Sequence, residues 1–216
     1  MRGETSPTTS AVREAVPLDT AALILAGDTE EVSLRERKKA RTWMALHEAA
    51  RSLVLERGLD GVTIEEICEV AEVSPRTFFN YFASKADAAL GLREPRIHDE
   101  AFARFAARGA EHGAVNDLCD LLAATIDLPP DTARVKELGR ERPEVSPAIH
   151  KWMSQLRTAI SDAAVDRLGE RRGRLAVALV FAGLFETIHE PAVSSADDLA
   201  ARLRERVAMM VEIAGA

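Results

Sequence analysis

The stretch that most constrains how this chain folds runs from Thr63 to Lys85, and it predicts two short helices joined by a tight turn. Thr63 and Glu66 have the S/T-x-x-E spacing of a capping box, which satisfies free backbone N–H groups, so a helix begins at Thr63. Ser74 is an N-cap residue, and Pro75 takes the first helical position, where its missing N–H costs nothing. A second helix therefore follows the first after a short connection.

Each predicted helix has a buried face and an exposed face. On the first helix, the apolar residues that gather on one side at 100° per residue are Ile64, Ile67, Cys68 and Ala71. On the second, Phe78 and Phe82 share the buried side, whereas Arg76 and Asn80 point away from it. This division predicts a helix-turn-helix, whose second helix presents its N-terminal residues to the major groove of DNA. The alternative is a helical hairpin in an ordinary bundle, with Arg76 and Asn80 merely solvated.

The residue types on the exposed face suit DNA reading. Arg and Asn make bidentate contacts with guanine and adenine edges, so we expect Arg76 and Asn80 to specify bases. The residues expected to hold the DNA backbone are Thr63, Ser74, Thr77, Tyr81 and Lys85. Two further residues, Pro75 and Phe79, complete the predicted surface.

A basic cluster precedes this stretch between Arg35 and Arg41, with only Glu36 as an acidic member. Within it, Lys38, Lys39 and Arg41 are predicted to contact phosphate, because a local patch attracts DNA even on a chain with a net charge of −7. The alternative is a solvated face at the start of a helix. Ser33 and Glu36 predict the start of that helix, and Gly58 predicts its end.

The residues from Arg41 to Leu90 resemble the N-terminal domain of TetR-family transcriptional regulators. The resemblance rests on Trp43 to Gly58, Thr63, Ile67, Ala71, Val73, Ser74, Thr77 to Phe82, Ser84 and Lys85. The end from Thr77 to Lys85 is its most specific part, and the rest of the chain matches only in architecture. The resemblance implies a dimeric, ligand-responsive DNA-binding regulator, usually a repressor, which dimerises through its last two helices.

Three positions depart from the family pattern. Glu72 stands where relatives commonly carry Gly in the turn, and a left-handed conformation there adds about 1–2 kcal/mol of strain. Phe79 replaces an aromatic residue often seen as Tyr, so a phosphate-contacting hydroxyl is absent, and Tyr81 is its candidate replacement. Arg76 stands where a small residue is common, so an operator sequence cannot be inferred from relatives.

The predicted fold is all-α, with three regions. Residues 1–32 mix Pro, Thr, Ser, Gly and acidic residues around one apolar patch, Ala21–Ala26, and predict a mobile tail. Residues 33–94 form the predicted three-helix DNA-binding domain, with a further helix from Lys85 to about Arg93. Residues 95–216 contain no run with period two, and predict a helical ligand-binding and dimerisation domain.

The last two helices are predicted from an apolar run at Leu175–Phe185 and from a capping pattern at Ser195 and Asp198. So much apolar surface favours pairing with a second copy, although a deep intramolecular core is the common alternative. The predicted interface residues are Leu175, Leu179, Leu199, Leu203, Val207 and Met210. The family resemblance also implies a cavity for a small effector, and its candidate lining residues are Phe102, Phe105, Trp152, Met153, Phe181 and Phe185.

Motifs of catalysis and metal binding are missing from the sequence. It holds no Gly-rich phosphate loop, G-x-S-x-G, H-E-x-x-H or C-x-x-C, and its five histidines form no ligand-spaced pair. Cys68 and Cys119 fit buried thiols in a reducing compartment. No apolar run is long enough to span a bilayer, and no signal peptide is recognisable. We therefore expect a cytoplasmic protein without cofactor, metal or enzymatic activity.

The interpretation that best fits these patterns is a sequence-specific transcriptional regulator. Its predicted partners are a palindromic operator in double-stranded DNA, a second copy of the chain and an unknown small-molecule effector that modulates or releases a repressor. One alternative is a constitutive DNA-binding protein without an effector. Another is a small-molecule-binding helical protein or enzyme whose N-terminal domain has lost its DNA role.

Overall fold

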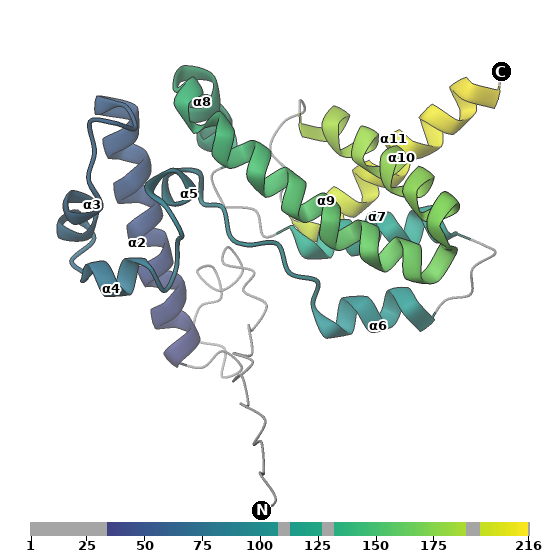
Figure 1. Cartoon of the computed structure of the whole chain (residues 1–216), viewed down its shortest axis with the longest axis horizontal. Coiled ribbons are helices and arrows are strands. Elements are labelled where there is room, and N and C mark those ends of the chain that lie inside the picture. The colour runs from purple at the N-terminus through teal and green to yellow at the C-terminus, as the bar shows by residue number, and fades with distance from the viewer. Residues whose placement is uncertain (1–33, 108–112, 127–131, 189–194, 216) are drawn as a thin grey trace, which may run out of the picture.

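The computed structural model describes residues 34–107, 113–126, 132–188 and 195–215. Every regular element in these ranges is a helix, which confirms the all-α prediction. Figure 1 shows two lobes: one contains the helices up to residue 90, and the other contains most of the helices that follow. The predicted tail at residues 1–32 and the capping residue Ser33 lie outside the described residues.

The N-terminal lobe contains α2 (Leu34–Arg57), α3 (Ile64–Val70), α4 (Pro75–Phe78) and α5 (Lys85–Leu90). α2 ends at Gly58, as expected, where a φ of 75° favours glycine. α5 ends before the predicted Arg93, because Gly91 adopts a left-handed conformation with a φ of 65° and closes the helix.

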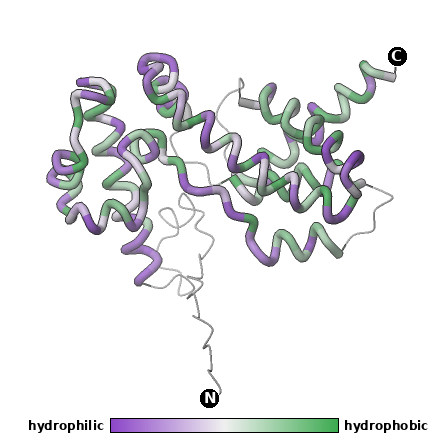
Figure 2. Tube along the Cα trace, in the orientation of Figure 1, coloured by the Kyte–Doolittle hydropathy of each residue, from purple (hydrophilic) through white to green (hydrophobic). Residues whose placement is uncertain are grey.

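The core of this lobe is built from the predicted apolar faces. Its buried side chains include Trp43, Leu46, Val54, Ile67, Phe78 and Phe82. The Phe82 ring lies 5.8 Å from Trp43 and 6.0 Å from Phe78, so α2 and the segment after α4 are packed through aromatic contacts. Figure 2 shows the alternation of apolar and polar positions along these helices.

The described chain after α5 contains the remaining helices. They are α6 (Asp99–Ala107), α7 (Ala114–Thr125), α8 (Thr132–Glu141), α9 (Ser146–Leu168), α10 (Glu170–Ile188) and α11 (Ala196–Gly215), with a 3₁₀ turn η1 (Pro143–Val145) before α9. α10 packs along α9 and also contacts α11 and α7. A Cβ atom at Gly173 would lie 2.9 Å from the backbone of Ala164, so only glycine permits this close approach of α10 to α9. In the described ranges no helix is both long and apolar enough to cross a membrane.

The apolar face of helix α11 packs against the rest of its own chain. Leu199, Leu203 and Val207 are all buried within a single chain, against α7 and α10. The sequence pattern predicts these three residues at a dimer interface, but their side chains fill the core of a single chain. A period of 3.6 residues identifies a buried face without identifying what covers it.

The other predicted interface positions are more open. Leu179 and Met210 are half-buried, and Leu175 is 64% exposed. The apolar residues that a second chain could cover are Leu175, Phe185, Met209, Val211 and Ile213, all on α10 and α11. These residues, unlike Leu199, Leu203 and Val207, remain exposed in the described part of a single chain.

Candidate nucleic-acid interface

The start of α3 has the predicted capping box. The Glu66 backbone N–H donates to Thr63 Oγ1 at 3.2 Å, and the Thr63 backbone N–H donates to Glu66 Oε2 at 2.8 Å. Arg57 from the end of α2 adds an ion pair to Glu66 Oε1 at 2.7 Å. The hydrogen bond from the Thr63 backbone, then those from the Arg57 and Thr63 side chains, lower the pKa of Glu66 to about 2. The capping box and Arg57 together fix α3 against α2.

Glu72, in the turn between α3 and α4, adopts a left-handed conformation. Its φ is 53°, and it is the only non-glycine residue with a positive φ in the described part of the chain. Such a residue adds about 1–2 kcal/mol of strain, and Gly would adopt the same conformation without it.

Helix α4 begins with a side-chain cap. The Thr77 backbone N–H donates to Ser74 Oγ at 3.1 Å, and the Ser74 and Thr77 hydroxyls lie 2.9 Å apart. Pro75 takes the first helical position. These two hydroxyls are thus hydrogen-bonded to each other before any DNA arrives, and a phosphate contact by either would extend or replace that hydrogen bond.

The predicted reading residues lie on the open side of α4. Arg76 and Asn80 are exposed, whereas Phe78 is completely buried. Asn80 lies just past the last residue of α4, and its backbone N–H bonds to the Thr77 carbonyl at 3.0 Å, so it remains one turn from Arg76. Phe79 is 59% exposed, with its ring edge-on to Phe78. The structure thus brings together the residues that the sequence assigned to base reading.

Lys85 has a local role that the sequence did not indicate. Its Nζ donates a 2.8 Å hydrogen bond to the Val62 carbonyl, just before the capping residue of α3. Tyr81 is half-buried and packs against the core of the N-terminal lobe. Contacts between residues distant in sequence follow from tertiary packing, and no local motif encodes them.

The basic cluster lies on the first turns of α2. Lys38, Lys39 and Arg41 are all exposed. The Phe82 ring packs on Trp43, two residues after Arg41, so the segment after α4 contacts α2 close to this cluster. The N-terminal half of α2 therefore packs against the segment that follows α4.

The profile of the bacterial regulatory proteins of the tetR family matches residues 46–89, which include α3, α4 and most of α5. Residues 46–89 are thus similar to the N-terminal domain of TetR-family regulators. The HTH-type transcriptional regulator TcmR of Streptomyces glaucescens is 49% identical over 57 residues, which are 26% of this chain and 25% of TcmR. The chain thus matches only about a quarter of the length of that relative. A crystal structure from Mesorhizobium loti MAFF303099, assigned to TetR-family transcriptional regulators, covers 82% of this chain and 98% of its own, with 16% identity and a TM-score of 0.47.

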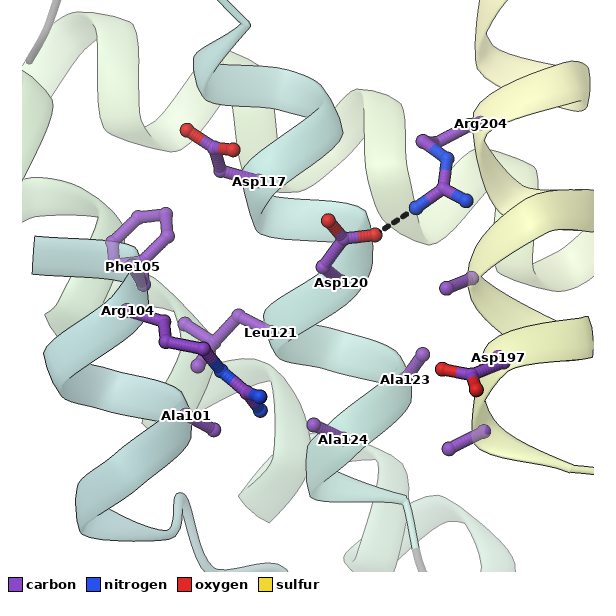
Figure 3. A pocket seen from close by; sticks show the side chains of 12 residues that line it. Ala101, Arg104, Phe105, Asp117, Asp120, Leu121, Ala123, Ala124, Asp197 and Arg204 are labelled. Carbon is purple, nitrogen blue, oxygen red and sulfur yellow. Dashed lines mark hydrogen bonds and ion pairs between the residues drawn. The ribbon is translucent and has the colours of Figure 1, made fainter. Parts of the chain in front are cut away.

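Beyond the TetR domain, the C-terminal lobe has a hollow of about 390 Å³ between α6, α7 and α11. Figure 3 shows its polar wall, where Arg104, Asp120 and Arg204 carry charged side chains and Asp120 is ion-paired with Arg204. Asp117 lines the inner end and pairs with Arg167 at 2.8 Å, both side chains being less than 10% exposed. The Arg167 guanidinium also lies 4.6 Å from the centre of the Phe105 ring. The hollow thus has charged groups of both signs beside an aromatic ring.

The predicted effector-pocket residues do not gather around this hollow. Only Phe105 lines it. Phe102 and Phe185 are exposed, and Met153 and Phe181 are half-buried against the lobe's core. Trp152 does not line the hollow, and its indole N–H donates to the Arg93 carbonyl at 2.6 Å. The prediction of pocket residues relied on large hydrophobic side chains, whereas the hollow is lined largely by small and charged residues.

The two cysteines lie outside the two sites described above. Cys68 and Cys119 are free and buried, and burial raises the pKa of Cys68 and raises that of Cys119 to about 12, so both are thiols at neutral pH. Among the residues that the structure describes, no three His, Cys, Asp or Glu side chains lie close enough to hold a metal ion.

Proposed function

We propose that this chain is a dimeric transcriptional regulator that binds a palindromic operator through α4 and its two-fold copy. The observation that carries the proposal is the arrangement of α4, where Arg76 and Asn80 are exposed beside the buried Phe78, inside the segment that matches the TetR family. A short capped helix that enters the major groove by its N-terminus brings only such outer residues to base edges.

The proposed DNA contacts fall into two classes. Arg76 and Asn80 specify bases, while Lys38, Lys39 and Arg41 contact phosphates and add affinity without sequence information. The supporting surface is formed by residues within α4 and on either side of it: Thr63, Ser74, Pro75, Thr77, Phe79, Tyr81 and Lys85. For Lys85 the support acts through the Val62 carbonyl, which its ammonium group already binds.

The dimer is proposed to form through α10 and α11. Leu175, Phe185, Val211 and Ile213 expose apolar side chains on these two helices, a concentration that monomeric proteins usually avoid. Two-fold pairing would present two copies of α4, as a palindromic site requires.

The hollow between α6, α7 and α11 is the proposed effector site. Its volume of about 390 Å³ fits a small molecule, and its charged wall favours a polar one. An effector acts only if it binds one arrangement of the DNA-reading helices more tightly than another. We propose repression released or modulated in this way, and no catalytic activity.

Selection of binding sites from random DNA tests the proposal. Wild-type protein is expected to yield a palindrome, and Arg76→Ala should relax the preference at one base pair in each half-site while reducing affinity by about 1–3 kcal/mol. Arg157→Ala, which removes an exposed arginine from α9, is the matched control and should return the wild-type motif. Identical motifs from wild type and Arg76→Ala would show that Arg76 reads no base. Recovery of no enriched sequence by the wild type would remove the proposed function.

A further inference from the structure

The covalent connection between the two lobes is extended. α5 ends at Gly91 and α6 begins only at Asp99. Residues 92–98 belong to no regular element. Without the backbone hydrogen bonds of a helix, such a segment cannot by itself hold two lobes in one orientation.

A second connection is made by packing. Leu138 of α8 and Val145 of η1 are completely buried, and both belong to the core of the N-terminal lobe. Figure 1 shows α8 beside the end of α2 that carries Arg57. Although they follow α7 in sequence, α8 and η1 are therefore part of the DNA-binding lobe in packing terms.

Arg142, between α8 and η1, binds the end of α2. Its Nη2 donates to the Leu55 carbonyl and, at 3.4 Å, to the Glu56 carbonyl. These carbonyls belong to the last turn of α2, where the helix itself offers no N–H partner. A guanidinium there also meets the negative end of the helix dipole.

Glu144 binds the residues that follow the same helix. Its Oε1 accepts a hydrogen bond from the Leu59 backbone N–H at 3.2 Å. A Cβ atom at Gly58 would lie 3.3 Å from that oxygen, so the glycine permits the close approach. Hydrogen bonds from its own backbone N–H and from Leu59 lower the pKa of Glu144, with a smaller contribution from the charge of Arg142.

The first turns of α9 reach the extended segment. Trp152 donates to the Arg93 carbonyl at 2.6 Å, and the Arg93 guanidinium lies 4.4 Å above the Trp43 ring in the core of the N-terminal lobe. α9 follows η1 directly and packs against α7 and α10. The residues around Arg142 thus connect α2 to the helices that line the hollow and expose the apolar face.

We propose that Arg142 and Glu144 form a clamp on the C-terminal end of α2 that fixes the orientation of the DNA-binding lobe relative to the C-terminal lobe. Arg142 and Glu144 are positioning residues: they touch no DNA, and they decide where α4 is held. The consequence for operator binding rests on the proposed function, whereas the orientation itself does not.

The orientation is measured as a distance between two spin labels on full-length protein. The labels are placed at the exposed positions Ser52→Cys on α2 and Ser154→Cys on α9, and the labelled chains are diluted with unlabelled protein so that only distances within one chain are recorded. Cys68 and Cys119 are buried and have raised pKa values, so they label slowly. The clamp predicts one narrow distance in the wild type. A broad distribution in the wild type would overturn the proposal without any clamp variant.

The clamp variants are Arg142→Met and Glu144→Ala, and their matched controls are Arg140→Met and Glu141→Ala at exposed positions on α8. Clamp variants should broaden the distribution, and controls should leave it narrow. Amide exchange at Leu59 should also become faster in Glu144→Ala, because its acceptor is removed. Glu144→Gln keeps an acceptor oxygen and should restore slow exchange. Folded clamp variants with the wild-type distribution would overturn the proposal.

Binding to DNA separates the clamp from the proposed function. On the palindrome selected by the wild type, clamp variants should lose about tenfold or more in affinity, because their two heads are no longer held at the right separation. On an isolated half-site they should bind like the wild type. An equal loss on both sites would show damage to the reading surface instead and would count against the clamp. If the wild type binds no DNA, the proposed function fails while the distance measurement still decides the clamp.

Discussion

The end of α4 and the α10–α11 pair both expose apolar side chains, but in different surroundings. Phe79, the residue that follows α4, is 59% exposed and lies between the polar Arg76 and Asn80 in sequence, while the neighbouring Phe78 is buried. On α10 and α11, Leu175 and Ile213 are 64% and 71% exposed, with other apolar residues on the same helices. An isolated exposed aromatic beside Arg and Asn suits a polar partner such as DNA, whereas a group of exposed aliphatic residues suits a second protein surface.

The buried residues of the two regions also lie beneath different kinds of surface. In the N-terminal lobe, the buried rings of Phe78 and Phe82 support the segment on which Arg76 and Asn80 are exposed. In the C-terminal lobe, Leu203 and Val207 fill the core of the chain, while Leu175 and Ile213 on the same pair of helices remain exposed. Buried and exposed members of each region should therefore respond differently to substitution.

The largest expected effect is on the N-terminal core. Phe78→Ala should lower the free energy of unfolding by about 3–5 kcal/mol, because it removes a fully buried ring. Phe79→Ala removes the same group from an exposed position and should lower it by about 1 kcal/mol or less, mostly through its edge contact with Phe78. Urea unfolding followed by circular dichroism measures both. Equal losses would mean that the two rings are not divided between core and surface.

A second pair of substitutions tests the same division in the C-terminal lobe. Leu203→Ala should destabilise the folded chain by about 2–5 kcal/mol whatever its concentration, since the side chain lies in the monomer core. Leu175→Glu should leave folding nearly unchanged and shift light scattering toward the monomer, because it places a charge on the exposed apolar face. A Leu175→Glu protein that remains dimeric at micromolar concentration would place the interface elsewhere.

A smaller effect is expected at the turn before α4. Glu72→Gly should stabilise the protein by about 0.5–1 kcal/mol, because relief of the left-handed strain exceeds the extra flexibility of glycine in the unfolded chain. Glu69→Gly, on the exposed side of α3, is the control and should destabilise the protein, since it weakens a helix without relieving strain. The midpoint of thermal unfolding measures both, and destabilisation by Glu72→Gly would contradict the strain.

The smallest effect concerns pH. The folded pKa of Glu66 is about 2, below its unfolded value of 4.5, so its contribution to stability is present above pH 4.5 and is lost as pH falls toward 2. Glu66→Gln should reduce the loss of unfolding free energy across that window, with a modest magnitude because the pair with Arg57 is exposed to solvent. Glu65→Gln in the same helix turn is the control. A pH dependence unchanged by Glu66→Gln would show that the capping box does not depend on the charge.

Local signals determined much of the DNA-binding lobe. The caps at Thr63 and Ser74, the glycine after α2 and the spacing of Phe78 and Phe82 each act within a few residues, so the sequence alone specified these helix starts, ends and faces. Tertiary structure decided the contacts between distant residues: Lys85 with Val62, Arg142 with the end of α2, and the placement of α8 in the N-terminal core. It also decided that Leu203 faces its own chain and that Phe105 alone of the predicted aromatics meets the hollow. Periodicity shows that a face is buried, but its partner depends on how the whole chain packs, because hydrophobic burial is not directional.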